Sequence, residues 1–145
     1  MFDDRNTFWF PFPGFAGFEV AINRLDPEQG LADFLLKFEP NAVIHLHRHM
    51  AETSTFVMQG EHRVYEPDGA LQDVRPVGSY TLTPVGAPPH REGAGDEPCI
   101  VHYSIRSDQD LIFEFLNDDL SLLAPLTIST TVGVWEQAKA AVVPA

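Results

Sequence analysis

Hydrophobic and polar residues alternate along several short stretches of this chain, which is the pattern of β-strands that bury one face. In residues 31–38, LADFLLKF, every even-numbered position is apolar, whereas Asp33 and Lys37 fall on the opposite face. Further short apolar stretches are VIHLH, STFVMQ, HRVYE, SYTLT, CIVHYSI and LIFEFL. The pattern predicts an all-β protein.

Turn-forming residues separate these stretches. The chain contains twelve prolines and ten glycines, and residues 66–69, EPDG, predict a hairpin turn, while PVGAPP from Pro84 predicts a loop. Helix-favouring residues are dense only near the C-terminus, from about Val134. We therefore predict a single domain, with an aromatic arm over residues 1–16, strands over 17–132 and a short helix and tail over 133–145. The arm is expected to pack across a sheet or against a second subunit.

The composition of the chain limits the classes of partner it can bind and the cellular compartment in which it is expected. The net charge is −12 and there is one cysteine, Cys99, so no internal disulfide can form. An acidic chain without a basic patch is a poor partner for nucleic acid or anionic lipid. No apolar run approaches the roughly 20 residues that cross a bilayer, and the first residues lack the features of a signal peptide. We expect a soluble cytoplasmic protein with no nucleic-acid or membrane partner.

Three of the six histidines, His45, His47 and His49, occupy alternate positions. On an extended strand they share one face, and neutral imidazole is the commonest metal ligand in proteins. Zinc, iron, copper and nickel all accept such ligands. A solvated polar strand is the alternative interpretation of this stretch taken alone.

A second stretch, GSYTLTPVGAPPH, runs from Gly78 to His90. It contains a predicted strand followed by a Pro/Gly turn, and the turn ends in a histidine. Together the two stretches resemble the motifs of the cupin superfamily. The first cupin motif has His-x-His, three or four residues, usually Glu, then six residues and a Gly. The second has Gly, five residues, Pro-x-Gly, two residues and His.

The residues that match the first motif are His47, His49 and Gly60, and those that match the second are Gly78, Pro84, Gly86 and His90, with one extra residue before the histidine. The resemblance implies a cupin jelly-roll β-barrel with one divalent metal per chain, held by His47, His49 and His90. Thr53 stands where most cupins have a glutamate ligand. A shifted alignment, in which His45, His47, Glu52 and His90 are the ligands, also fits the spacing.

A three-histidine cupin without that glutamate is similar to the β-diketone-cleaving dioxygenases related to acetylacetone dioxygenase and dihydroxyacetophenone dioxygenase. The tail TISTTVGVWEQAKA is similar to the ending of that group. The resemblance implies a small-molecule substrate, Fe(II) as the favoured metal with Zn or Ni as alternatives, and a homodimer or homotetramer. The polar residues that orient the substrate in those dioxygenases have no counterpart in this sequence, since Tyr65 stands where an arginine is expected.

Other residues have both a functional and a structural interpretation. Glu52, Tyr65 and His102 are candidates for polar groups near the metal, although the alternation in CIVHYSI predicts that His102 points away from the core. We expect His62 to be exposed. Arg91 and Glu92 follow His90 and could flank the mouth of the site, although a surface ion pair is the arrangement that we expect. The remaining candidates are the aromatic side chains of Phe34, Phe38 and Phe56, as walls of a substrate pocket or as core, and the hydroxyls of Tyr80 and Tyr103 as hydrogen-bond donors.

Two other functions remain open at this point. One is a zinc cupin that senses a small molecule or regulates a partner, as in the anti-sigma-factor cupins. The other is a cupin enzyme with non-oxidative chemistry, such as an isomerase or a hydrolase. Three imidazoles suit all of these metals, so the ligand types alone do not choose among the functions.

Overall fold

A computed structural model describes residues 2–142 of the chain. In that range it contains twelve strands and one helix. The strands are β1 (Phe10–Pro11), β2 (Phe18–Asp26), β3 (Leu31–Phe38), β4 (His47–His49), β5 (Glu52–Gln59), β6 (His62–Tyr65), β7 (Leu71–Arg75), β8 (Tyr80–Thr83), β9 (Arg91–Ala94), β10 (Cys99–Arg106), β11 (Leu111–Leu116) and β12 (Leu122–Thr127), and the helix is α1 (Ile128–Ala141).

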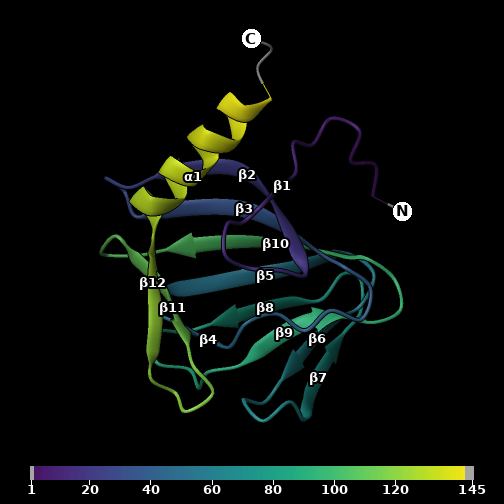
Figure 1. Cartoon of the computed structure of the whole chain (residues 1–145). Helices are drawn as coiled ribbons and strands as arrows, with labels where there is room; N and C mark the ends of the chain where they lie inside the picture. The colour runs from purple at the N-terminus through teal and green to yellow at the C-terminus, as the bar shows by residue number, and fades with distance from the viewer. Residues whose placement is uncertain (1, 143–145) are drawn as a thin grey trace.

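The strands form three antiparallel sheets that surround a common interior (Figure 1). The largest has the order β1-β2-β3-β10-β5-β8, and the two smaller ones have the orders β12-β11-β4 and β7-β6-β9. This mostly-β architecture with one C-terminal helix agrees with the predicted all-β class, although the sheets remain separate rather than closing into the predicted continuous barrel.

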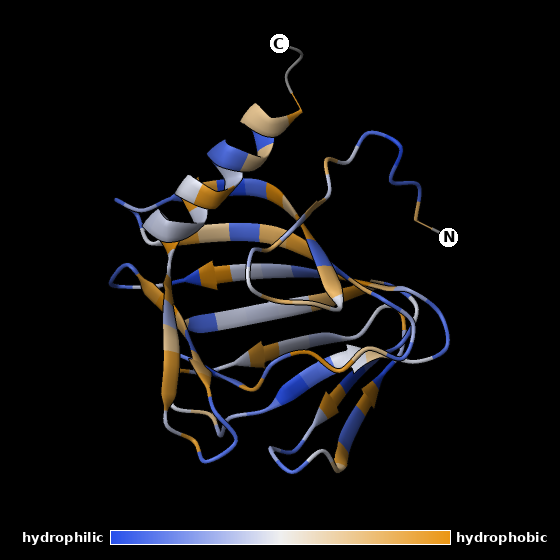
Figure 2. Cartoon of the chain, viewed as in Figure 1, coloured by the Kyte–Doolittle hydropathy of each residue, from blue (hydrophilic) through white to orange (hydrophobic). Residues whose placement is uncertain are grey.

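The alternation along residues 31–38 matches the structure. Ala32, Phe34, Leu36 and Phe38 of β3 are buried in the main hydrophobic core, and the opposite face carries Asp33 and Lys37. The hydropathy colouring in Figure 2 shows the same mixture of apolar and polar positions along the strands. Strands β1, β2, β7, β9 and β12 were not among the stretches that the pattern singled out.

Turn geometry explains one residue of the first motif. Gly60 lies between β5 and β6 with φ 75°, and a Cβ atom there would lie 2.6 Å from the Pro98 carbonyl oxygen. A larger side chain is thus excluded both by backbone conformation and by the neighbouring chain. The predicted turn at residues 66–69 connects β6 and β7, and residues 84–90 form no strand, as expected.

The helix begins earlier than the sequence predicts. It starts at Ile128 rather than near Val134, because Thr127 caps it by accepting a hydrogen bond from the Thr130 backbone N–H. The β-branched residues of this first turn favour a strand by propensity, and the cap together with burial of Ile128 overrides that preference. Residues 143–145 of the predicted tail lie outside the described residues.

The aromatic arm packs on the sheet, which agrees with one of the two expectations for it. Phe10 of β1 pairs with Val20 and is buried in the core. Asp4 accepts hydrogen bonds from the Trp9 indole and from Lys37 on the outer face of β3. Among the described residues, α1 is the one helix, and it is not long and apolar enough to cross a membrane.

Candidate metal centre

Backbone pairing brings the two motifs together. The backbone of His47 in β4 and that of His90, which directly precedes β9, exchange both hydrogen bonds, His47 N–H to His90 C=O and His90 N–H to His47 C=O. Residues paired in this way across antiparallel chains lie opposite each other with their side chains on the same face. The third histidine, His49, lies two residues along β4 and therefore points to that face as well.

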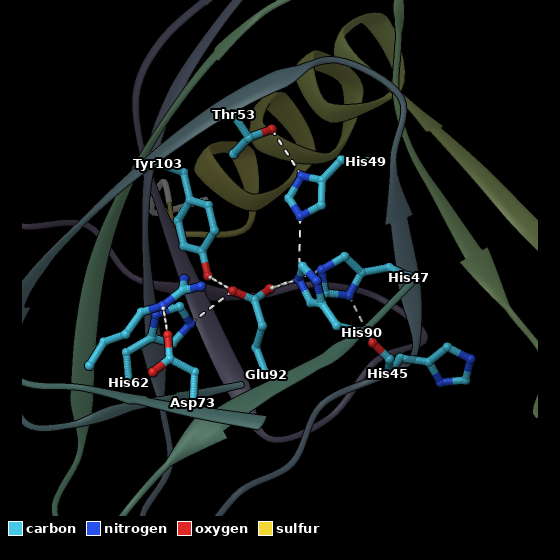
Figure 3. A network of polar contacts seen from close by, with 10 residues as sticks. His45, His47, His49, Thr53, His62, Asp73, His90, Glu92 and Tyr103 are labelled. Atoms are coloured by element: carbon cyan, nitrogen blue, oxygen red, sulfur yellow. Dashed lines mark hydrogen bonds and ion pairs between the residues drawn. The ribbon is translucent and has the colours of Figure 1, made fainter. Parts of the chain in front are cut away.

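The three imidazoles form a compact cluster. One ring nitrogen from each of His47, His49 and His90 lies within 4.8 Å of the others, and the Nε2 atoms of His49 and His90 are 3.3 Å apart. His47 and His49 are 3% and 2% exposed, while His90 is half-buried. Figure 3 shows the rings converging from β4 and from the start of β9.

Hydrogen bonds fix which nitrogen of two of the rings faces the cluster. The Nδ1–H of His47 donates to the His45 carbonyl oxygen at 3.0 Å. The Nδ1 of His49 lies 3.0 Å from the hydroxyl of Thr53, and that hydroxyl donates to the Ala51 carbonyl oxygen, so it must accept from His49 Nδ1–H. The Nε2 atoms of both rings are left to face the cluster.

Thr53 therefore has a definite role at the position where the cupin motif usually has its glutamate. Its side chain is fully buried and orients His49 instead of offering an anionic ligand. Metal-binding histidines characteristically donate their second N–H to a fixed oxygen in this way.

A buried carboxylate completes the polar side of the interior. Glu92 of β9 is 3% exposed, and its Oε2 lies 2.9 Å from His47 Nε2 and 3.9 Å from His90 Nε2. Its Oε1 accepts hydrogen bonds from His62 Nε2–H and from the Tyr103 hydroxyl, each at 2.8 Å. Figure 3 shows Glu92 between these two groups and the histidine cluster.

Burial and charge shift the pKa values of these groups in opposite directions. Burial, together with the charge of His47, lowers the pKa of His49 to about 3 and that of His90 to about 4. Burial also lowers the pKa of His47, but the hydrogen bond and the charge of Glu92 outweigh it, so the net pKa is raised. Burial raises the pKa of Glu92, yet the hydrogen bonds from His47 and His62 outweigh it and hold that pKa well below its ordinary value.

An apolar cavity of about 60 Å³ adjoins the cluster. The polar or titratable residues that line it are His47, Glu92, Tyr103 and Thr131. The apolar lining residues are Phe12, Phe18, Val20, Ile22, Ala32, Phe34, Leu36, Ile44, Ile112, Phe113, Phe115 and Leu126. Pairing of β11 with β4 places Phe113 opposite His49 and Phe115 opposite His47, so aromatic walls stand directly beside the imidazoles.

The structure separates the other predicted site residues from the cluster. His45 donates from Nε2 to the Leu116 carbonyl oxygen and packs near Phe15, which leaves it outside the set of converging nitrogens. Glu52 is exposed at the start of β5. The shifted ligand set with His45 and Glu52 is therefore not assembled.

Tyr65 is half-buried at the end of β6 and does not line the cavity. His102 is half-buried on β10, with its neighbours Val101 and Tyr103 buried on the inner face, as the alternation predicted. Tyr80 is exposed. Of the aromatic candidates, Phe34 lines the cavity and Phe38 is core, but Phe56 is 44% exposed and cannot be a pocket wall.

Two expectations were wrong. His62 is fully buried rather than exposed, because its strand directs it inward together with Val64, where it stacks on Phe38. Glu92 does not pair with Arg91 at the surface. Arg91 instead binds Asp118, and Glu92 points inward because it follows His90 by two residues on the same extended backbone.

The donor set fits a divalent metal. Three imidazole nitrogens converge from two neighbouring backbone segments, and the two most buried rings have their second nitrogens bonded to protein oxygens. Such a set suits zinc, iron(II), nickel or copper and leaves further coordination positions for a substrate. The residues that would hold the ion are His47, His49 and His90.

Comparison with known proteins identifies a family and several structures to which this chain is similar. Residues 1–106 match the model of the ChrR cupin-like domain. An RmlC-like cupin protein from Ralstonia eutropha JMP134 is similar in structure, with a TM-score of 0.78 and 19% identity, over 99% of this chain and 89% of that one. An acetylacetone dioxygenase from Acinetobacter johnsonii is also similar, with a TM-score of 0.77 and 16% identity, over 95% of this chain and 91% of that one.

Solved structures of lower similarity include cupin enzymes with other activities. A polyketide cyclase from Streptomyces resistomycificus has a TM-score of 0.59 at 18% identity, over 77% of this chain and 82% of that one. A DMSP lyase from Ruegeria pomeroyi DSS-3 has a TM-score of 0.58 at 18% identity, over 76% of this chain and 61% of that one. A comparison with curated proteins finds no match. At these identities the structural likeness establishes the fold alone.

Proposed function

The chain belongs to the family of ChrR cupin-like domains, and from this premise we propose that it is a metal-dependent dioxygenase. Its substrate would be a small molecule of the β-diketone or hydroxyketone type, and the reaction would cleave a carbon–carbon bond. The observation that carries the proposal is the three-histidine cluster beside an apolar cavity, which His47 lines. Fe(II) is the metal that this proposal favours.

The bound metal would supply Lewis acidity and a template for two oxygen atoms of a chelating enolate. His47, His49 and His90 would hold it, and the hydrogen bonds to the His45 carbonyl and to Thr53 keep two of these rings from turning. The chemistry balances with one diketone and one dioxygen, because both oxygen atoms enter the two cleavage products.

The cavity supplies the rest of the proposed site. Phe34, Phe113 and Phe115 line it and would enclose the carbon skeleton of the substrate while excluding water. Within residues 2–142, no lysine or arginine lines the cavity, so a substrate with several negative charges would find no cationic side chain there. A compact and largely apolar substrate with one acidic carbon position fits these walls best.

Oxygen consumption tests the proposal. Protein loaded anaerobically with iron(II) is mixed with aerated buffer and a panel of 1,3-diketones and hydroxyacetophenones, with His49→Ala as the inactive control and His102→Ala as the matched active control. We expect uptake that needs substrate, iron and His49 but not His102. Absence of uptake across the panel, with metal still tightly bound, would contradict the dioxygenase proposal.

A non-oxidative reaction at the same metal is the second candidate. It is favoured by the cyclase and the lyase among the structurally similar cupins, which use the same fold for other chemistry. A zinc cupin with a sensing role would also bind metal tightly and show no oxygen uptake. Turnover of a panel substrate under anaerobic conditions would identify the non-oxidative enzyme, and binding without turnover would identify the sensor.

A further inference from the structure

We propose that Glu92 is a fourth protein ligand of the metal, supplied by β9 in place of the glutamate that Thr53 replaces. This inference rests on the metal centre proposed above and specifies its charge and its remaining open positions. It is carried by the contacts of the two carboxylate oxygens of Glu92, which differ sharply.

One oxygen is fully occupied by the protein. Oε1 accepts hydrogen bonds from His62 Nε2–H and from the Tyr103 hydroxyl, both at 2.8 Å. These three side chains are buried, and Tyr103 is further held by stacking on Phe34. These contacts hold the carboxylate with its second oxygen toward the cluster before any ligand arrives.

The other oxygen faces the histidine cluster. Oε2 lies 2.9 Å from His47 Nε2 and 3.9 Å from His90 Nε2. The Nδ1–H of His47 is already given to the His45 carbonyl oxygen, so its Nε2 is the atom that a metal would take. Once His47 binds a metal through Nε2, that nitrogen has no hydrogen to offer Oε2, and the buried oxygen needs another positive partner.

The spacing agrees with that partner being the metal itself. Donor atoms bonded to one ion at about 2.1 Å lie about 3.0 Å apart when cis in an octahedron and about 3.4 Å apart in a tetrahedron. The separations of Oε2 from the two histidine nitrogens, 2.9 and 3.9 Å, lie on either side of these values. A small shift of the carboxylate is enough to complete the shell.

The position of Glu92 in the chain also allows it to replace the glutamate ligand that the first motif lacks. Thr53 orients His49 and carries no charge, so the first motif supplies no anionic ligand. Glu92 follows His90 by two residues, which places the two side chains on the same face of one extended segment. Gly93 permits this segment to lie against residues 42–43, since a Cβ atom there would overlap the Ala42 carbonyl oxygen.

A bound carboxylate defines the class of substrate more narrowly. A divalent ion with three neutral imidazoles and one carboxylate carries a net charge of +1. A chelating ligand with one negative charge, such as an enolate, makes the complex neutral, which is the favoured state beside an apolar cavity. In an octahedral shell, four protein ligands leave two positions, enough for one bidentate substrate.

The experiment that decides the assignment is a crystal structure of the full chain loaded with zinc or cobalt(II), with anomalous data at the metal edge. We expect one anomalous peak bonded to the three histidines and to Glu92 Oε2. A peak bonded to the histidines with Glu92 detached would overturn this inference and leave the metal centre standing. No peak at the histidines would overturn the metal centre itself.

Metal affinity of Glu92→Gln, measured by competition with a chelator, gives the second readout. Affinity alone does not separate a ligand from a hydrogen-bonded neighbour, because losing either weakens binding about 10–100-fold, so the crystal structure remains necessary. We expect a loss of at least about tenfold for Glu92→Gln and none for Glu66→Gln, an exposed glutamate in the β6–β7 turn. Unchanged affinity in Glu92→Gln would overturn the assignment.

Discussion

The interior of this protein has two unlike halves. On one side His47, His49 and Glu92 are buried beside the half-buried His90, a concentration of titratable groups that is costly unless each group has a partner. On the other side the cavity wall is almost entirely apolar. The two halves meet at His47 and Glu92, which line the cavity and also belong to the polar cluster.

The two halves of the interior have different roles in the proposed site. The polar half is organised by hydrogen bonds with specific geometry, and it can hold a cation in one place. The apolar half is organised by packing, and it offers shape and exclusion of water. A substitution in one half should therefore leave the function of the other half largely intact.

Loss of a ligand should have the largest effect. His49→Ala removes one of the three converging nitrogens, and we expect metal affinity to fall by more than about 100-fold, beyond the 10–100-fold typical of residues that only support a ligand. Chelator competition measures the affinity, and circular dichroism checks that the sheets persist. His102→Ala is the matched control. Equal metal affinity in the two variants would remove His49 from the site.

Acid should destabilise the metal-free protein. The folded pKa values of His49 and His90 are depressed to about 3 and about 4, so below their ordinary pKa of about 6.5 the unfolded chain binds two protons that the folded chain does not. Stability is present above pH 6.5 and is lost as the pH falls.

Other groups of the cluster act in different pH ranges. The raised pKa of His47 adds stability that is fully present below pH 6.5 and lost only above it, so it does not oppose this loss. The depressed pKa of Glu92 adds stability that is fully present above about pH 4.5 and is lost only below it, outside this interval. We expect a loss on the order of 2 kcal/mol between pH 6.5 and 5.5 in urea denaturation. An unfolding free energy that stays flat over this interval would contradict the burial of two neutral histidines.

Removing the support of Glu92 should have an intermediate effect. Tyr103→Phe deletes the hydroxyl that donates to Glu92 Oε1 but keeps the ring that stacks on Phe34. A hydrogen bond to a charged group contributes about 1.5–3 kcal/mol, and we expect the unfolding free energy to fall by about that amount. Tyr80→Phe, at an exposed position of β8, should change it little. Equal effects of the two variants would show that the hydroxyl of Tyr103 does not support a buried charge.

Filling the apolar half should have the smallest effect, and it should leave the metal in place. Ala32 of β3 lines the cavity and is fully buried, so Ala32→Leu reduces the space for a substrate. We expect the Michaelis constant for an apolar substrate to rise about tenfold, which is about 1.4 kcal/mol of binding, at unchanged metal affinity. Ala140→Leu on the exposed face of α1 is the control. Loss of metal in Ala32→Leu would mean that the halves are not independent.

Sequence reasoning recovered the histidine cluster because both motifs carry their spacing within short segments. The alternation of strand residues placed His45, His47 and His49 on one face, and the resemblance to the two cupin motifs selected His47, His49 and His90. What it missed was the pairing of residue 47 with residue 90, a contact between distant segments that no local period reveals.

The missed residues did carry a usable signal. Glu92 follows His90 by two positions, and His62 precedes the buried Val64 by two, so the same alternation that was applied to His47 and His49 directs both side chains inward. Charge and polarity outweighed that rule in the prediction. Thr127 was likewise a capping residue in a segment whose β-branched composition favours a strand, which is why the helix was predicted to begin too late.

We infer above all that the polar half binds a divalent metal through its imidazoles. The most direct test is the iron K-edge X-ray absorption spectrum of the full chain loaded with iron(II), since coordinated imidazole rings give characteristic multiple-scattering features. We expect a shell that includes three imidazoles, with those features weakened in His49→Ala. A spectrum of oxygen ligands alone, identical in both proteins, would contradict it.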